Sequence, residues 1–142
     1  MIIIWAASVL FIWILLLALA SKGAKKNAMQ KETISLDQEM ISRKIYEIDS
    51  LLKGSPASVR NALLEMDKLV DYTLKNSGAK GTTFADRLKT VEHKINNKED
   101  LWKAHRLRNR FAHDLGMDLV PSQVQKAVAD MKKSIIDLGA RI

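Results

Sequence analysis

Apolar residues follow two different patterns along the 142-residue chain. Residues 2–20, IIIWAASVLFIWILLLALA, are apolar on every side, with Ser8 as the one polar side chain and no charge. After residue 34, apolar positions recur every three or four residues, which is the period of an α-helix with one buried face. The first pattern predicts a helix in an apolar medium, and the second predicts amphipathic helices that share a core.

Five amphipathic segments follow residue 34, and none shows convincing strand alternation. Helix signals bound several of them, such as Ser55 before Pro56 at a start and Gly116 after an end. The segments cover residues 35–53, 56–76, 83–95, 99–115 and 120–138. The residues expected to face the core are Ile41, Ile45, Ile48, Leu52, Val59, Leu63, Met66, Val70, Phe84, Leu88, Val91, Ile95, Ala104, Leu107, Phe111, Leu115, Val124, Val128, Met131, Ile135 and Leu138. We predict an all-α fold, with a single N-terminal transmembrane helix followed by a compact bundle of about five helices.

The segment 2–20 has the length of a membrane-spanning helix. At 1.5 Å per residue it spans roughly 28 Å, close to the ~30 Å apolar core of a bilayer. A cleaved signal peptide is the alternative, because the ALA tripeptide that ends the segment resembles a cleavage site. No charge precedes the segment, whereas three lysines lie within the next six residues. The positive-inside rule then predicts an uncleaved anchor at residues 1–21 in the cell (plasma) membrane, with the C-terminal part in the cytoplasm.

Residues 22–34 are polar and basic, with four lysines and one glutamate and no apolar stripe. They are typical of a linker at a membrane surface, where lysines attract anionic lipid headgroups. This linker holds +3 of the chain's net charge of +7, so the excess in residues 35–142 is mild and does not by itself require nucleic acid. Residues 35–142 are long enough to bury a core and form one domain.

The absence of cysteine excludes disulfides, thiolate zinc sites and cysteine nucleophiles. His93, His105 and His113 are the only histidines, and no paired-carboxylate metal motif is present. We therefore expect neither a metal nor another cofactor.

The fourth predicted helix carries a group of cations in LRNRFAHDLG, residues 107–116. Opposite its core stripe lie four polar residues, Arg106, Asn109, Arg110 and His113. Arg108 lies instead beside the core stripe, where it must pair or reach around its neighbours. A residue that breaks the apolar pattern is a functional candidate. A solvated helix end is the simpler alternative, because cations there suit the helix dipole and Arg-x-x-x-x-His occurs often by chance.

The stretch RNRFAH, Arg108 to His113, resembles the signature of the HEPN family, the nucleotide-binding domains of higher eukaryotes and prokaryotes. The family pattern is an arginine, a polar residue that is often asparagine, and a histidine four to six positions after the arginine. Members are small α-helical bundles with the motif in their C-terminal half. The resemblance covers roughly residues 35–140, and the anchor is an addition to the family's common core.

Many HEPN proteins are metal-independent ribonucleases that act as toxins, in defence or in RNA processing, and two chains of a homodimer commonly share the active site. The resemblance implies that Arg108 stabilises the scissile phosphate, that His113 transfers protons, and that Asn109 orients the histidine or the phosphate. The residue types suit cleavage by the RNA 2′-hydroxyl, since histidine moves protons near neutral pH and arginine stabilises phosphoryl charge. An antitoxin or another regulatory partner is a further expectation.

The neighbouring residues have two interpretations each. Lys103, Arg106 and Arg110 could follow an RNA backbone, although surface charges need no explanation. Trp102 could stack on a base, although a tryptophan on a bundle helix usually belongs to the core or an interface. His105 could join the site because it lies on the same face as Asn109, although a partly exposed surface position is the simpler expectation.

Arg108 and His113 point about 140° apart on a straight helix, so one chain holds them together poorly. Either the helix distorts before Gly116, or a two-fold dimer brings the two motifs together, with the surface near Arg108 as its interface. Three functions are open: a membrane-anchored ribonuclease, a non-catalytic HEPN-like module that binds RNA, nucleotide or protein, and a tethered helical adaptor. An intrachain salt bridge on Arg108, together with a His113 that lies far from any second copy, would favour the adaptor.

Overall fold

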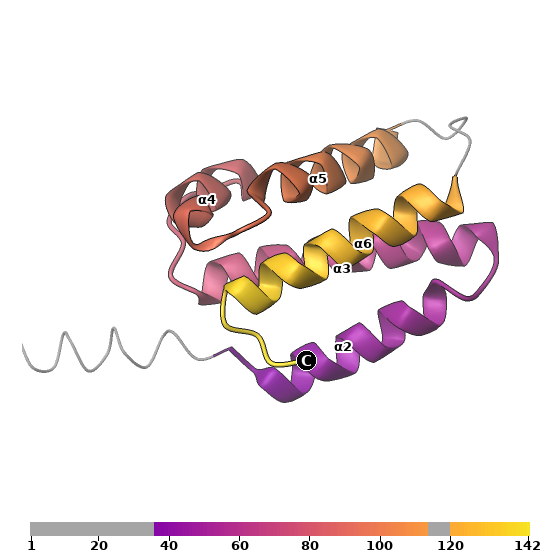
Figure 1. Ribbon diagram of the computed structural model, residues 1–142, viewed down its shortest axis with the longest axis horizontal. Helices are drawn as coiled ribbons and strands as arrows, with labels where there is room; N and C mark the ends of the chain where they lie inside the picture. Colours follow the sequence, from indigo (N-terminus) through magenta and orange to yellow (C-terminus); the bar gives the residue numbers. More distant parts are fainter. Residues whose placement is uncertain (1–35, 114–119) are drawn as a thin grey trace, which may run out of the picture. The chain divides into compact units, whose positions relative to one another are not determined.

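Helices make up the regular structure of the computed structural model, which describes residues 36–113 and 120–142 (Figure 1). Residues 35–142 form one compact unit. The elements are α2 (Gln38–Leu51), α3 (Pro56–Asn76), α4 (Phe84–Val91), the 3₁₀ turn η1 (Glu92–Lys94), α5 (Lys98–His113) and α6 (Pro121–Asp137). The prediction of an all-α bundle is confirmed for the described part of the chain.

Side chains at the helix starts explain several boundaries. Ser55 caps α3 by accepting a hydrogen bond from the backbone of Ser58, and Pro56 occupies the first turn, as predicted. Thr83 caps α4 and forms a reciprocal capping box with Asp86. α2 begins later than expected, because Asp37 is its cap and its carboxylate accepts from the backbone of Met40.

The core lies between α3 and α6, with α2 packed on α3 and α5 packed on α6 and α3 (Figure 1). Most residues expected to face inward are buried, including Ile41, Leu63, Met66, Leu88 and Met131, each with no exposed surface. Leu52 and Phe84 are only half-buried and pack against the edge of this core. The helical period therefore identified the packing faces correctly.

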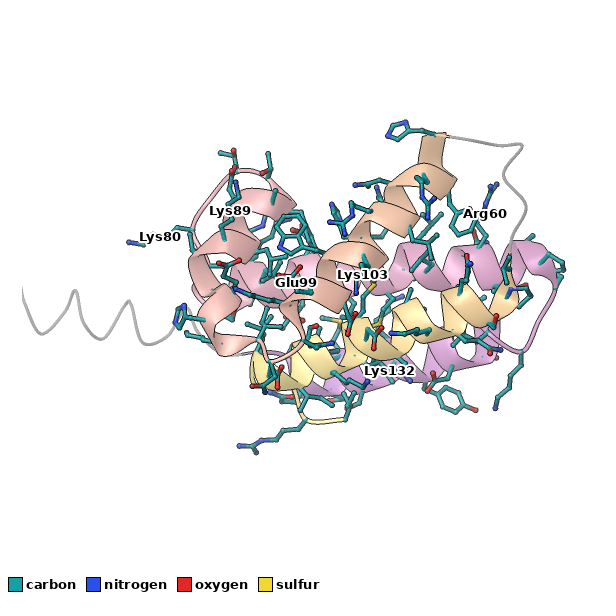
Figure 2. The ribbon with its side chains drawn as sticks, turned by 45° about the horizontal axis from the view of Figure 1, so that its top comes forward. Arg60, Lys80, Lys89, Glu99, Lys103 and Lys132 are labelled. Carbon is teal, nitrogen blue, oxygen red and sulfur yellow. The ribbon has the colours of Figure 1, made fainter. Side chains whose placement is uncertain are left out.

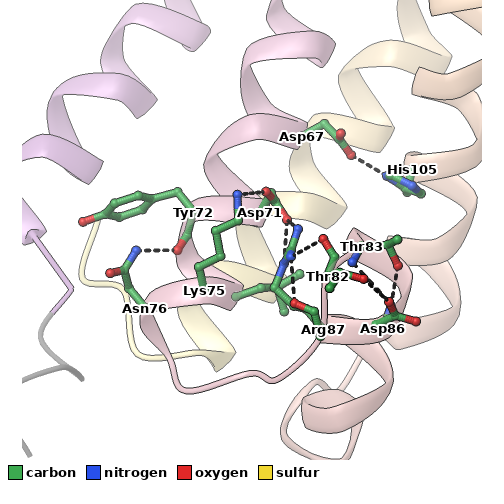
Figure 3. A network of polar contacts seen from close by, with 12 residues as sticks. Asp67, Asp71, Tyr72, Lys75, Asn76, Thr82, Thr83, Asp86, Arg87 and His105 are labelled. Atoms are coloured by element: carbon green, nitrogen blue, oxygen red, sulfur yellow. Dashed lines mark hydrogen bonds and ion pairs between the residues drawn. The ribbon is translucent and has the colours of Figure 1, made fainter. Parts of the chain in front are cut away.

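The third predicted helix is α-helical only as far as Val91 and then tightens into η1. Arg87 fixes the loop before this helix. Its guanidinium donates to Asp71 on α3 and to the backbone carbonyls of Gly81 and Thr82 (Figure 3). The arginine thereby gives two loop carbonyls a hydrogen-bond donor, and its pairing with Asp71 attaches α4 to α3.

Several predicted features lie outside the described residues. These are the anchor at residues 1–21, the linker at 22–34, and the end of the fourth predicted helix at Leu115 and Gly116. None of the helices within residues 36–113 and 120–142 combines the length and the hydropathy needed to cross a bilayer.

Candidate functional site

Helix α5 has one buried and one polar face, as its sequence predicts. Its buried residues are Leu101, Ala104, Leu107 and Phe111. Arg106, Arg110 and His113 are exposed, and Asn109 is half-buried. The candidate residues therefore share one helix, but they differ in what they contact.

Arg108 pairs with an acidic residue of another helix. Its Nε lies 3.2 Å from Oδ2 of Asp67 on α3, and its Nη1 donates a 3.0 Å hydrogen bond to Oδ1 of Asn109. The contact with Asp67 is an ion pair without hydrogen-bond geometry, so the buried Nε–H has no hydrogen-bond acceptor among the described residues. The expectation that Arg108 needs a partner is confirmed, and its side chain keeps 28% of its surface exposed.

His105 joins the same network from one turn earlier in α5. Its Nδ1 lies 2.7 Å from Oδ1 of Asp67 (Figure 3), and its Nε2 lies 3.1 Å from Nδ2 of Asn109. The Asp67 side chain is 7% exposed and that of His105 is 15% exposed. His105 is therefore partly exposed, as expected, and it also contacts Asn109 of the motif.

Two aromatic residues hold the imidazole of His105 in place. Phe84, the first residue of α4, stacks on it with ring centroids 3.8 Å apart and planes inclined by 2°. Trp102 stands edge-on to both rings, at 6.4 Å from Phe84 and 6.3 Å from His105. Both aromatic side chains also pack against the core, as the sequence favours for Trp102.

The polar side of α5 contains an open hollow of about 480 Å³, lined by Lys103, Arg106, Asn109 and Arg110. All four residues were identified from the sequence, and none is acidic. Within the described ranges, Arg106 and Arg110 form no ion pair, whereas Lys103 (Figure 2) pairs with Asp100 at 3.0 Å. The hollow thus combines three cations with an amide that is hydrogen-bonded to Arg108.

A second hollow of about 270 Å³ lies between α5 and α6 and shares Lys103 and Arg110 with the first. Asp100 and the buried Asp130 add negative charge to its lining. The pKa of Asp100 lies below its usual value, chiefly because Lys103 donates a hydrogen bond to its carboxylate. This mixed lining suits an anion less well than the first hollow, which has three cations and no acidic residue.

His113 is the last residue of α5 and is exposed. Over the described part of the chain, no hydrogen bond or ion pair joins it to Arg108 or Asn109. The two halves of the expected catalytic pair are therefore not brought together by one chain, in line with their angular separation on the helix.

Asp67 was not identified from the sequence, although it contacts two residues of α5, His105 and Arg108. It lies on the buried face of α3, beside Met66 and Val70, so the available signal is an acidic residue within an apolar stripe. Such a residue requires a cation or hydrogen-bond donors on a neighbouring helix. Arg108 likewise breaks the apolar pattern of its helix, and the two side chains form an ion pair with each other.

No group of three or more His, Asp or Glu residues in the described ranges is arranged to hold a metal ion. Comparisons with protein-family models, with curated proteins and with solved structures give no match to this chain. Function is therefore inferred from α5 and its neighbours on α3 and α4.

Proposed function

We propose that residues 35–142 form a HEPN-like domain that binds RNA along α5 and cleaves it without a metal, as a toxin, defence or RNA-processing endoribonuclease. The observation that carries this proposal is the hollow lined by Lys103, Arg106, Asn109 and Arg110. Its cations lie along one helix, beside the arginine of the motif. A row of cations, two of which form no ion pair within the described ranges, is suited to a polyanionic backbone.

The cleavage step assigns one role to each motif residue. The 2′-oxygen attacks the adjacent phosphorus, its bond to phosphorus forms, and the bond to the 5′-oxygen breaks. His113 takes the proton of the 2′-hydroxyl, and the leaving 5′-oxygen gains a proton from the imidazolium or from water. Arg108 stabilises the charge that develops on the phosphoryl oxygens. Asn109 holds the guanidinium through its Oδ1.

The assembly we propose is a two-fold dimer in which Arg108 of one chain faces His113 of the other. We expect light scattering on a chain that begins at residue 35 to give twice its monomer mass, because only a second copy can complete the site. A monomer that cleaves RNA at full rate at every concentration would contradict the shared site.

Removing the cations of the hollow should weaken RNA binding without changing the fold. We expect Arg106→Ala and Arg110→Ala each to lower the salt dependence of binding by about one unit in the slope of log K against log salt, as one phosphate contact is lost. Binding of a labelled single-stranded RNA is measured by fluorescence anisotropy at several salt concentrations, in a His113→Ala background that prevents cleavage.

Two exposed residues on other helices supply matched controls. Arg43→Ala on α2 removes the same charge, and Lys89→Ala removes a cation of α4 (Figure 2). Neither control should change the salt slope. Equal effects at all four positions would mean that RNA binding depends only on the net charge of the protein, and would contradict a binding face on α5.

Residues 2–20 are proposed as a membrane anchor that places the bundle in the cytoplasm, because three lysines directly follow this segment. A protease added outside intact cells should leave the bundle uncut and should digest it after lysis. A mature protein that begins at Ser21 would contradict the anchor.

A second candidate function is a HEPN-like module or helical adaptor that binds RNA, nucleotide or protein without cleavage. The ion pair between Arg108 and Asp67 favours it, because a buried carboxylate offsets part of the charge that a phosphate would meet. In this case the cationic hollow still binds RNA, but the wild-type chain does not cleave it. His113→Ala then has no effect on cleavage. Cleavage by the wild-type chain separates the two candidates.

A further inference from the structure

We propose that His105 and Asp67 are positioning residues, which fix the amide of Asn109 and thereby hold Arg108 toward the phosphate. This inference rests on the proposed function for its effect on RNA, but its geometric part can be tested without RNA. This inference assigns His105 a role other than proton transfer, although His105 directly contacts Asn109 of the motif.

The direction of each hydrogen bond follows from chemistry. The guanidinium of Arg108 can only donate, so the atom of Asn109 that it contacts is the amide oxygen Oδ1. The amide nitrogen Nδ2 therefore faces His105, and because Nδ2 also only donates, Nε2 of His105 must accept. An imidazole with an accepting Nε2 is neutral and carries its proton on Nδ1. That proton is donated to Oδ1 of Asp67 at 2.7 Å.

The network closes into a ring of four side chains from two helices. Oδ2 of Asp67 lies 3.2 Å from Nε of Arg108. The carboxylate of Asp67 therefore contacts both His105, where the series of hydrogen bonds begins, and Arg108, where it ends. With His105 neutral, the ring holds one negative and one positive charge. Stacking by Phe84 restricts the plane of the imidazole, and so restricts where its two nitrogens point.

The ring determines what His105 can do. Both of its nitrogens are occupied by partners, and 15% of its side chain is exposed, so it has no free nitrogen for a proton of the substrate. Its contribution is instead to keep the Asn109 oxygen turned toward Arg108. Groups that orient a functional side chain in this way commonly contribute on the order of 10–100-fold to affinity or activity, as known for residues that hydrogen-bond to metal ligands.

The tautomer is the first test, and it needs no RNA. In the ¹⁵N-labelled full chain solubilised in detergent, long-range ¹H–¹⁵N spectra should show His105 protonated on Nδ1 and unprotonated on Nε2 at neutral pH. This is the less common neutral form of histidine, so a merely packed side chain would not be expected to adopt it. Protonation on Nε2 would overturn the ring.

Two substitutions at His105 form the second test. His105→Gln keeps one acceptor and one donor but cannot transfer protons, whereas His105→Phe keeps an aromatic plane without polar atoms. The Arg108 Nε–H signal should stay near its wild-type position in the glutamine variant and move in the phenylalanine variant. RNA cleavage should stay within about threefold of wild type for glutamine and fall on the order of 10–100-fold for phenylalanine.

The outcomes separate this inference from the proposed function. A glutamine variant as inactive as His113→Ala would make His105 a proton-transfer residue and would overturn its positioning role. Wild-type rates and an unmoved Arg108 signal in the phenylalanine variant would also overturn it. If the phenylalanine variant does not fold, the glutamine variant and the tautomer still decide. A wild-type chain that shows the Nδ1–H tautomer but neither binds nor cleaves RNA would refute the proposed function and leave the ring intact.

Discussion

Replacing His113 with alanine should lower the rate of RNA cleavage by about 10²–10⁴-fold, the usual contribution of a general acid–base residue. His113 is exposed at the end of α5, so its removal should leave the thermal unfolding transition almost unchanged. Single-turnover cleavage of a labelled RNA by the full chain measures the effect, and RNA binding should remain close to that of the wild type.

His93→Ala is the matched control, because His93 is also exposed but belongs to η1 rather than to α5. It should cleave RNA at the wild-type rate. A His113→Ala variant that retains that rate would assign proton transfer to another group and would remove the main chemical support for the motif.

Replacing Arg108 with alanine should lower the cleavage rate on the order of 10²–10³-fold, as for other preorganised donors to a developing charge. Arg108→Lys should restore little, because an ammonium does not reproduce the planar fork of the guanidinium. The cleavage rate at saturating RNA concentration measures both variants. Wild-type cleavage by the lysine variant would show that only the charge matters.

The partner of Arg108 complicates this measurement, because alanine leaves the buried carboxylate of Asp67 with less compensation. The variant should therefore also unfold at a lower temperature. The double variant Asp67→Asn/Arg108→Ala removes the uncompensated charge and should recover part of that stability without recovering cleavage. Recovery of both would mean that Arg108→Ala loses activity only because the fold is weakened.

Mixed dimers test whether the site is shared between chains. Arg108→Ala and His113→Ala chains, each inactive alone, should regain about a quarter of the wild-type activity when mixed, because half of the dimers are mixed and each has one complete site. If each chain contained a complete site, the mixture would regain no cleavage activity. The mixture is measured after co-refolding or co-expression, so that the chains exchange.

The helices and their buried faces could be predicted from the sequence because each depends on local signals. The three- and four-residue spacing of Ile41, Ile45 and Ile48 marks the inner face of α2, and Ser55 marks the start of α3. The precise ends were less predictable: α2 begins at Gln38, because the side chain of Asp37 caps it. The change from α4 to a 3₁₀ turn after Val91 was not predicted either.

The candidate site was only partly predictable, because the helical period gives the faces of one helix but not the contacts between helices. The cations of α5 share one helix, so their common face followed from the helical period. Asp67 lies 38 residues before His105, and only the packing of α3 against α5 brings the two together. The ring that results could not be read from LRNRFAHDLG alone, although Arg108 already indicated that a partner was needed.

Analysis of the cleavage products tests the proposal that the motif of α5 cleaves RNA without a metal. The purified full chain is incubated with a mixture of RNAs, with and without a chelator, and the products are examined by mass spectrometry. We predict fragments that end in a 2′,3′-cyclic phosphate, in equal yield under both conditions. A folded, dimeric wild-type chain that releases no such fragments from any RNA would contradict the account.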